Sequence, residues 1–372
     1  MKNAIMFTLC LLIFVQCKEE AKEFPVLDLD GSHPTKTLAI SDLVTNLRAV
    51  RLETTEESLL PAFFNYLAGE KYIITYSRDN IMQFTSQGKF IRILSKKGNG
   101  PGEFNNVASL VMDNSEEKLY LSHMGSNELL VFDLASGYPK DEISIPDKAA
   151  RMVFVNDEEI LAFGYPFGDY KRFSVNVNTT EIKDSIKFEE AEEKPMGNRI
   201  TWISKASDQV YSLFPESDTL YRYADNEFVP ELYLLFSNQV DPNKTSTGRS
   251  LQFPMNGTNH MLLGTHDVSM EMSNGFVRMK NSGENPRIFY FDKVKQKLFE
   301  VSILEDDLMK KDMEYLFDLR QQGDHISIKY TALDIIEHLE ANPALESYVS
   351  DLFDGYEFNE DDNPVLVMGK VF

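Results

Sequence analysis

The sequence has little cysteine, tryptophan and basic charge, and no long hydrophobic run. Two Cys in 372 residues exclude a disulfide framework and a Cys-based zinc site. Lys and Arg number 37 against 59 Asp and Glu, which gives a formal net charge of −22. We expect no nucleic-acid partner and no docking on anionic lipid through a basic patch, because both need a basic surface.

The first seventeen residues have the features of a signal peptide. A weakly basic start is followed by an apolar run over residues 4–15. This run is shorter than the roughly 20 residues that span a bilayer, but it suits a signal-peptide core. It ends in Phe14-Val15-Gln16-Cys17, which resembles the bacterial lipobox, in which the Cys receives lipid; a plain secretory signal is the alternative. We expect residues 1–16 to be removed and a lipidated Cys17 to anchor the protein in the membrane.

An acidic tract follows Cys17, with the sequence Lys-Glu-Glu-Ala-Lys-Glu over residues 18–23. It resembles the surface-export signal of Bacteroidetes lipoproteins, and the alternative is a solvated tether. We expect residues 17–36 to form a lipidated tether. The predicted location is the outer membrane with the domain exposed on the cell surface, or alternatively facing the periplasm.

The remaining sequence consists of short β-rich runs separated by Gly, Asn, Asp and Pro, a pattern typical of all-β proteins. The runs fall into about five sets of roughly 40 residues between residues 62 and 303, a period typical of β-propeller blades. We therefore predict an all-β fold, a six-bladed β-propeller over residues 37–372. Strands from both ends of the chain would close the last blade and remove exposed sheet edges. The candidates for this blade are residues 38–40, 49–52, 325–328 and 365–368.

A short helical insertion is expected at about residues 305–355, near the C-terminus. Apolar residues recur with the period of an amphipathic helix over 332–339 and again over 345–352. Asn342-Pro343 between them resembles an N-cap followed by Pro at the first helical position. A third helix is predicted over 308–319 from a similar spacing. We expect these helices to cover one face of the ring, and a lid or a partner-docking element is the alternative.

The most distinctive motif is Gly98-Asn99-Gly100-Pro101-Gly102-Glu103-Phe104. Together with residues 84–91, it resembles the six-bladed β-propeller lipoproteins of Bacteroidetes, which are distant relatives of NHL-repeat propellers. Residues 38–43, 50–54 and 363–366 resemble the first and last strands of that family. The resemblance implies the fold and the outer-membrane location rather than an activity.

This motif is predicted to be a structural crossing between two blades. Its glycines permit left-handed backbone and close approach, and its proline stiffens the turn. A phosphate-binding loop is excluded, because no Gly-Lys-Ser/Thr and no helix pattern follow. The crossing residues are Gly98, Gly100, Pro101, Gly102, Glu103 and Phe104.

Catalytic motifs are missing from the sequence, which has neither a Gly-x-Ser-x-Gly elbow nor a two-His helical metal motif. The densest group of possible metal ligands is His266, Asp267 and Glu271. We expect this group on the inner strand of the fifth blade, where carboxylates near the axis would suit Ca²⁺. Ordinary structural polar residues are the alternative.

We expect a non-catalytic binding or interaction module that holds a protein or a small-molecule ligand at the propeller funnel. The alternative is a metal-assisted propeller hydrolase or lyase with a central cation, and a purely structural role is a third possibility. Acidic residues ordered on the axis would favour the enzyme. An apolar or aromatic funnel rim, with the loop at residues 165–170 as a candidate, would favour the binding module.

Overall fold

The structure is a computed structural model, and it describes residues 24–372 except for residues 62–63, 166, 190–201, 207, 215–216, 238–245, 274–275, 314–315 and 317–318. The predicted signal peptide, Cys17 and the acidic tract lie outside the described residues. None of the helices within the described ranges is long and apolar enough to cross a membrane.

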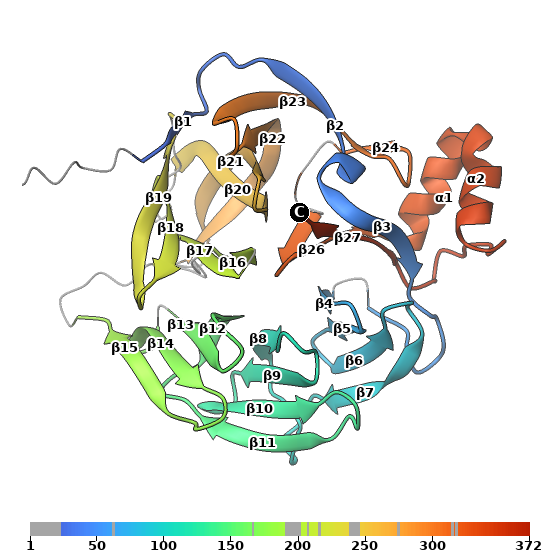
Figure 1. The fold of residues 1–372 in the computed structure, drawn as a ribbon. Helices are drawn as coiled ribbons and strands as arrows, with labels where there is room; N and C mark the ends of the chain where they lie inside the picture. Colours follow the sequence, from blue (N-terminus) through green and yellow to red (C-terminus); the bar gives the residue numbers. More distant parts are fainter. Residues whose placement is uncertain are drawn as a thin grey trace, which may run out of the picture.

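The described strands form six β-sheets around a common centre, so the prediction of an all-β propeller is confirmed (Figure 1). Five sheets are built mainly from strands that follow one another along the chain. The first sheet contains β4 (Asn65–Ala68), β5 (Tyr72–Tyr76), β6 (Asn80–Thr85) and β7 (Phe90–Lys96). The second contains β8 (Val107–Met112), β9 (Lys118–His123), β10 (Glu128–Asp133) and β11 (Pro139–Ser144). The third contains β12 (Ala149–Phe154), β13 (Glu159–Gly164), β14 (Tyr170–Asn176) and β15 (Ile182–Lys187).

The fourth and fifth sheets each gain a parallel outer strand from the N-terminal segment. The fourth contains β16 (Trp202–Ala206), β17 (Gln209–Leu213), β18 (Thr219–Ala224) and β19 (Glu227–Leu235), and β1 (Val26–Asp28) pairs with β19. The fifth contains β20 (Ser246–Asn256), β21 (His260–Ser273), β22 (Phe276–Asp292), β23 (Lys297–Asp306) and β24 (Lys311–Asp312), and β2 (Thr35–Ala39) pairs with β23. The domain therefore starts before residue 37, inside the segment that we expected to be a tether.

The sixth sheet, which we call the closing sheet, joins the two ends of the chain. Its order is β25 (Leu319–Gln322), β26 (His325–Tyr330), β27 (Val365–Val371) and β3 (Val44–Arg51). The strand predicted at residues 38–40 does not belong to it. Residues 35–39 form β2 in the fifth sheet, and the 3₁₀ helix η1 (Ile40–Asp42) then turns the chain towards β3.

The helical insertion lies between β26 and β27, at the outside of the ring beside the closing sheet (Figure 1). It contains α1 (Ala332–Ala341), the 3₁₀ helix η3 (Pro343–Leu345) and α2 (Glu346–Leu352). Thr331 caps α1 through a capping box with Asp334. The predicted third helix at 308–319 is wrong, because Leu319 begins β25 and residues 311–312 form β24. Its apolar side chains Leu308, Leu316 and Leu319 instead pack on the hydrophobic core from turns and a strand.

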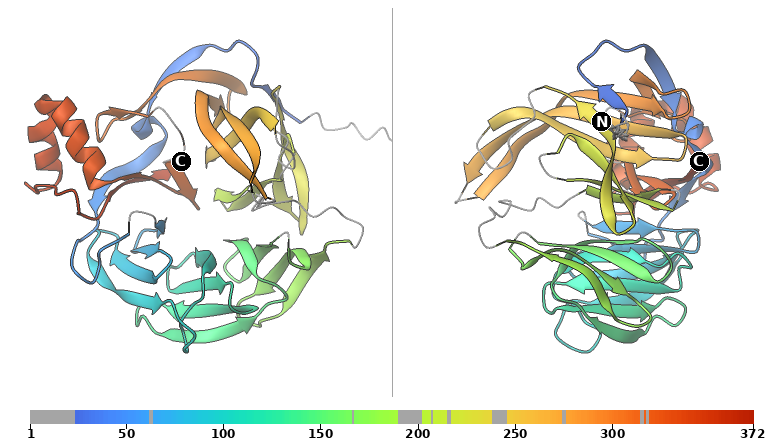
Figure 2. Two further views of the ribbon diagram at one scale, coloured as in Figure 1. Left: turned by 180° about the vertical axis from the view of Figure 1, so that it is seen from behind. Right: turned by 60° about the vertical axis from the view of Figure 1, so that its left-hand side comes forward.

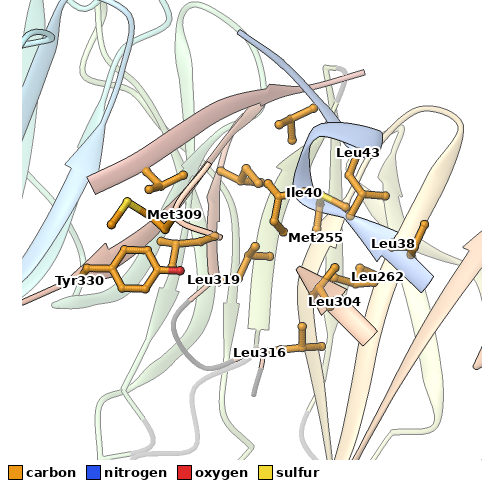
Figure 3. Close-up of a cluster of buried hydrophobic side chains, with 14 of the residues drawn as sticks. Leu38, Ile40, Leu43, Met255, Leu262, Leu304, Met309, Leu316, Leu319 and Tyr330 are labelled. Atoms are coloured by element: carbon orange, nitrogen blue, oxygen red, sulfur yellow. The ribbon is translucent and has the colours of Figure 1, made fainter. Parts of the chain in front are cut away.

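The hydrophobic core lies between neighbouring sheets. A cluster that includes Ile74, Phe104 and Leu121 fills the space between the first and second sheets. The largest cluster joins the fifth sheet, the closing sheet and the two helices. Figure 3 shows part of it, including Met255, Leu304 and Tyr330. Every sheet in the ring can thus bury both faces, which suits the near-continuous apolar runs of the strands.

The fifth sheet carries a long hairpin that projects beyond the ring (Figure 2). Its strands β21 and β22 have 14 and 17 residues, whereas β5 and β6 of the first sheet have 5 and 6. The β-rich runs at residues 276–279 and 287–291 are parts of one strand, β22. The part of β21 that follows Thr265 and the part of β22 that precedes Arg287 form the outer end of this hairpin, which we call the fifth-sheet arm.

Candidate ligand pocket

The first strand of each sheet lies nearest the centre of the ring. Strand β8 is next to β4 and β12, while β25 is next to β16 and β20. The turn that follows this first strand lies on the same face of the ring in each sheet, and five of the sheets line a pocket there. This pocket has a volume of about 760 Å³, within the usual range for small-molecule sites. Its lining includes the turns at residues 69–71, 113–116 and 323–324, together with Asp157 and Asp208.

Glu116 ties the second sheet to the first at the pocket rim. Its carboxylate accepts hydrogen bonds from the backbone N–H groups of Glu70 (2.6 Å), Lys71 (2.8 Å) and Tyr72 (3.1 Å). Lys71 returns a bond from Nζ to the carbonyl oxygen of Ser115 at 2.9 Å. These bonds hold two turns of the rim in a fixed position, and they leave the Glu116 carboxylate engaged by the protein itself.

Asn114 connects the second, third and fourth sheets on the same rim. Its Nδ2 donates to Oδ1 of Asp157 at 2.6 Å, and its Oδ1 accepts from Nζ of Lys205 at 3.4 Å. Lys205 comes from the first strand of the fourth sheet, and only 10% of its side chain is exposed. Asp208 lies 3.8 Å from this ammonium, but its own side chain is 95% exposed. A buried cation therefore reaches the pocket from β16.

The closing sheet completes the rim through Glu70. The Glu70 carboxylate accepts a bond from Nζ of Lys370 at 3.1 Å and lies 3.6 Å from Nε2 of His325. The hydrogen bond from Lys370 lowers the pKa of Glu70, while burial lowers the pKa of His325. Near neutral pH this contact is therefore an ion pair between Glu70 and Lys370, with a neutral imidazole beside it.

Arg320 enters the pocket from β25. Its guanidinium donates to Oδ1 of Asn65 at 3.0 Å and lies 5.4 Å from the ring centre of Tyr66. The next residues also bond across sheets, since Gln322 accepts the N–H of Ala68 at 3.1 Å. Polar and charged groups thus dominate the rim. It is neither the aromatic rim nor the axial group of acidic residues that the sequence analysis considered.

The predicted metal ligands do not come together in the structure. His266, Asp267 and Glu271 lie on β21, the second strand of the fifth sheet, rather than on its inner strand β20. Adjacent residues of a strand point to opposite faces, so His266 and Asp267 diverge. Glu271 is four residues beyond Asp267, about 13 Å along a strand. Nor do the described residues contain any group of three His, Cys, Asp or Glu side chains arranged to hold a metal ion.

These three residues also lie far from the pocket. The turn from β20 to β21 is on the pocket face, and β21 then runs towards the opposite face into the fifth-sheet arm. Glu271 pairs in register with Arg278 of β22 near the tip of this arm. The aromatic loop at residues 165–170 also lies away from the pocket, because it connects the second and third strands of its sheet, β13 and β14. Tyr165 and Phe167 stack there at 4.7 Å, on the face opposite the pocket.

The motif at residues 98–104 joins β7 to β8, and so connects the first sheet to the second. Oε2 of Glu103 accepts the N–H of Gly100 at 2.7 Å, and Phe104 is fully buried in the cluster between these sheets. A Cβ atom on Gly98 would lie 1.9 Å from Oε2 of Glu103. Gly102 has φ +72°, and Ser95 donates to its carbonyl oxygen at 2.6 Å. Pro101 lies in the turn between these glycines.

The pocket residues Lys205 and Arg320 were not among the residues predicted from the sequence. The one signal that pointed to them is the charge of the first strands, which becomes visible only when the strand order is known. A lysine or arginine in a single β-rich run is otherwise typical of a solvated face.

The fold has counterparts among solved structures. A protein described as a "Putative exported protein" from Bacteroides fragilis matches with a TM-score of 0.62 and 15% sequence identity, over 93% of this chain and 99% of that chain. A member of the duf4221 family from Bacteroides vulgatus matches with a TM-score of 0.46 and 9% identity, over 88% of this chain and 97% of that one. A comparison with curated proteins finds none that matches. The family described as "Domain of unknown function (DUF4934)" matches residues 24–370, and the chain therefore belongs to the DUF4934 family.

Proposed function

We propose that this protein is a non-catalytic binding module that holds its ligand in the pocket of the propeller funnel. In this proposal the closing sheet is the sixth blade of a six-bladed ring, distantly similar to NHL-repeat propellers. Lipid on Cys17 anchors the domain in the outer membrane, with the pocket exposed at the cell surface. A small molecule, or a short segment of a protein, is the ligand.

The observation that carries the proposal is a pocket with a polar rim that five sheets build together. A volume of about 760 Å³ is enough for a small organic ligand. The rim turns are held by bonds between sheets, such as those of Glu116 and Asn114, so the pocket is organised before a ligand arrives. Preorganisation of this kind reduces the entropic cost of binding.

The alternative of a metal-assisted hydrolase or lyase has no observation in its favour among the described residues. The enzyme would need ligands that converge on the axis, but His266, Asp267 and Glu271 lie on the fifth-sheet arm. The Ca²⁺ expected there therefore has no ligand set in the described part of the chain.

The test is a thermal-shift panel on residues 18–372 with glycans, peptides and organic acids, and with Ca²⁺ in the presence and absence of a chelator. A ligand at about 100 times its Kd stabilises the folded state by roughly 2.7 kcal/mol. Asn114→Trp places a large ring at the pocket mouth. Asn178→Trp is the matched control, because Asn178 is exposed in the turn between β14 and β15.

We expect a ligand that raises the Tm of the wild type and of Asn178→Trp, but not that of Asn114→Trp. An equal shift in Asn114→Trp would place the ligand outside the pocket and contradict the proposal. Conversion of the bound ligand, detected by mass spectrometry, would contradict the non-catalytic role. For the anchor, we expect radiolabelled palmitate to be incorporated in cells by the wild type and not by Cys17→Ala.

A further inference from the structure

The charges of this protein are separated in an unusual way. The chain carries 59 acidic residues, yet none of the six first strands, β4, β8, β12, β16, β20 and β25, contains an Asp or Glu. The same strands contain four basic residues, which are Arg151, Lys205, Arg249 and Arg320. Acidic residues near the pocket are confined to the turns at its rim. The centre of a strongly acidic protein is therefore lined by strands that carry only positive charge.

One of the four basic residues is already neutralised. Arg249 forms an ion pair with Asp30 and also donates to Oγ1 of Thr265 at 2.7 Å. The other three are placed differently. Lys205 and Arg320 line the pocket. Arg151 is an exposed residue of β12, the first strand of the third sheet, whose later residues also line the pocket. Arg151 and Arg320 both lie close enough to Tyr76 to lower the pKa of its phenol, against the larger raising effect of burial. Both guanidinium groups therefore lie near Tyr76, at the end of β5 in the first sheet.

The acidic residues of the rim compensate these cations only in part. Oδ1 of Asp208 lies 3.8 Å from Nζ of Lys205, but the Asp208 side chain is 95% exposed. Glu70 is paired with Lys370, and the Glu116 carboxylate accepts three backbone N–H groups. Asp113 accepts the N–H groups of Glu117 and Lys118 within its own turn at 2.8 and 3.0 Å. The partner of Arg320 in the pocket is the neutral amide oxygen of Asn65. A guanidinium has five N–H donors, and a carboxylate, sulfate or phosphate group can use two of them at once.

We propose that the pocket binds a small organic anion whose acidic groups contact Arg320 and Lys205, which line the pocket from two different sheets. This inference rests on the proposed binding function and adds the chemical class of the ligand. The guanidinium of Arg320 supplies a bidentate contact, and the ammonium of Lys205 supplies a second positive charge from another sheet. Asn114 and Gln322 add neutral polar groups for the rest of the ligand, such as the hydroxyl groups of an acidic sugar.

The experiment is isothermal titration calorimetry of residues 18–372 with four probes. Tri-galacturonate, a sulfated chondroitin disaccharide and citrate carry oxyanions on different frameworks, and galactotriose is the neutral counterpart of the first. The protein variants are Arg320→Gln, Lys205→Gln and the charge-conserving Arg320→Lys. Arg78→Gln is the matched control, because Arg78 is exposed in the turn between β5 and β6 on the other face.

We expect at least one oxyanion probe to bind and galactotriose to bind at least 10-fold more weakly. Arg320→Gln and Lys205→Gln should each weaken the binding by roughly 10- to 100-fold, the usual range for a lost charge-assisted contact. Arg320→Lys should retain part of the affinity, and Arg78→Gln should bind as the wild type does. Raising NaCl from 150 to 500 mM should lower the affinity for the oxyanion probe several-fold. The Tm of each variant checks its folding, and Lys205→Gln carries the test if Arg320→Gln does not fold.

Two results would overturn the inference. If galactotriose binds as tightly as tri-galacturonate and neither Gln variant changes the affinity, the ligand class is wrong but the binding function stands. If none of the oxyanion probes binds, the inference is again wrong. In that case the thermal-shift comparison of Asn114→Trp with Asn178→Trp decides the binding function separately.

Discussion

The seam of the ring, where the closing sheet meets the first sheet, contains the side chain of Asn363, which bonds to the segment between β3 and β4. This side chain is buried, with 2% of the residue exposed, and lies just before β27. Nδ2 donates to the carbonyl oxygens of Glu53 and Ser58, and Oδ1 accepts the N–H of Leu60, all at 2.8 Å. The segment over residues 53–60 follows β3 and leads to β4. One amide group therefore holds the closing sheet to the first sheet.

Asn363→Ala should destabilise the protein by about 3 kcal/mol. The substitution removes three hydrogen bonds, and each contributes roughly 1 kcal/mol net. The unfolding entropy is about 2.1 cal/mol/K per residue, or roughly 0.7 kcal/mol/K for a chain of this length. A loss of about 3 kcal/mol thus corresponds to a fall in Tm of about 4 °C. Differential scanning calorimetry of residues 18–372 measures this shift.

Asn359→Ala is the control for this seam. Asn359 lies in the same loop between α2 and β27 as Asn363, but it is exposed. A surface substitution of this kind usually changes stability by less than about 0.5 kcal/mol. If the Tm of Asn363→Ala falls within 1 °C of the control, the bonds of Asn363 do not hold the seam and the reasoning is refuted.

Three further predictions concern the backbone, the pH dependence and the helical insertion. Gly102→Ala should destabilise by more than Gly323→Ala, because both glycines have positive φ but only at Gly102 would the new Cβ meet Pro139, at 2.8 Å; equal losses in urea unfolding would contradict this. Burial, followed by the charge of Lys293, lowers the pKa of His260 to about 4. The folded state then binds fewer protons than the unfolded state between pH 4 and 6.5, so stability should fall by about 3 kcal/mol as the pH drops through this window. His260→Leu should flatten that part of the urea-derived stability curve, and an unchanged slope would assign the effect to other groups. Thr331→Ala should cost about 1 kcal/mol through loss of the α1 cap, measured by thermal unfolding, and no loss would show that the cap is dispensable.

The sequence predicted the outer strands of the sheets better than the inner ones. For example, three β-rich runs of the sequence, at residues 71–76, 81–84 and 89–94, correspond to β5, β6 and β7, because each is apolar and ends at a turn that contains Asp or Gly. Strand β4 was missed, since its four residues Asn-Tyr-Leu-Ala have neither the length nor the alternation of a typical strand. Strand β25, with the sequence Leu-Arg-Gln-Gln, was read as the end of a helix for the same reason.

The pocket could not be predicted for a related physical reason. Two of the first strands, β4 and β25, have only four residues each and are therefore weak β signals in the sequence. Lys205 and Arg320 are 115 positions apart, so only the ring closure at β27 and β3 brings them to one pocket. In contrast, His266, Asp267 and Glu271 are close in sequence but lie on one long strand. Proximity in sequence suggested a site there, and the alternation of the strand separates its members.

The negative net charge of the whole chain and the positive charges of its first strands act on a ligand over different distances. A net charge of −22 repels an approaching anion, and at 10 mM salt the Debye length of about 30 Å lets this repulsion reach across the solvent around the domain. At 150 mM salt the Debye length is about 8 Å, so the outer acidic residues are screened from the axis while groups in contact are not. Above 150 mM, the salt dependence of binding therefore reports on the contacts of Arg320 and Lys205 rather than on the net charge. In the proposed binding mode, the acidic exterior disfavours non-specific polyanions, and the cations of the inner strands act only on a ligand small enough to enter the pocket.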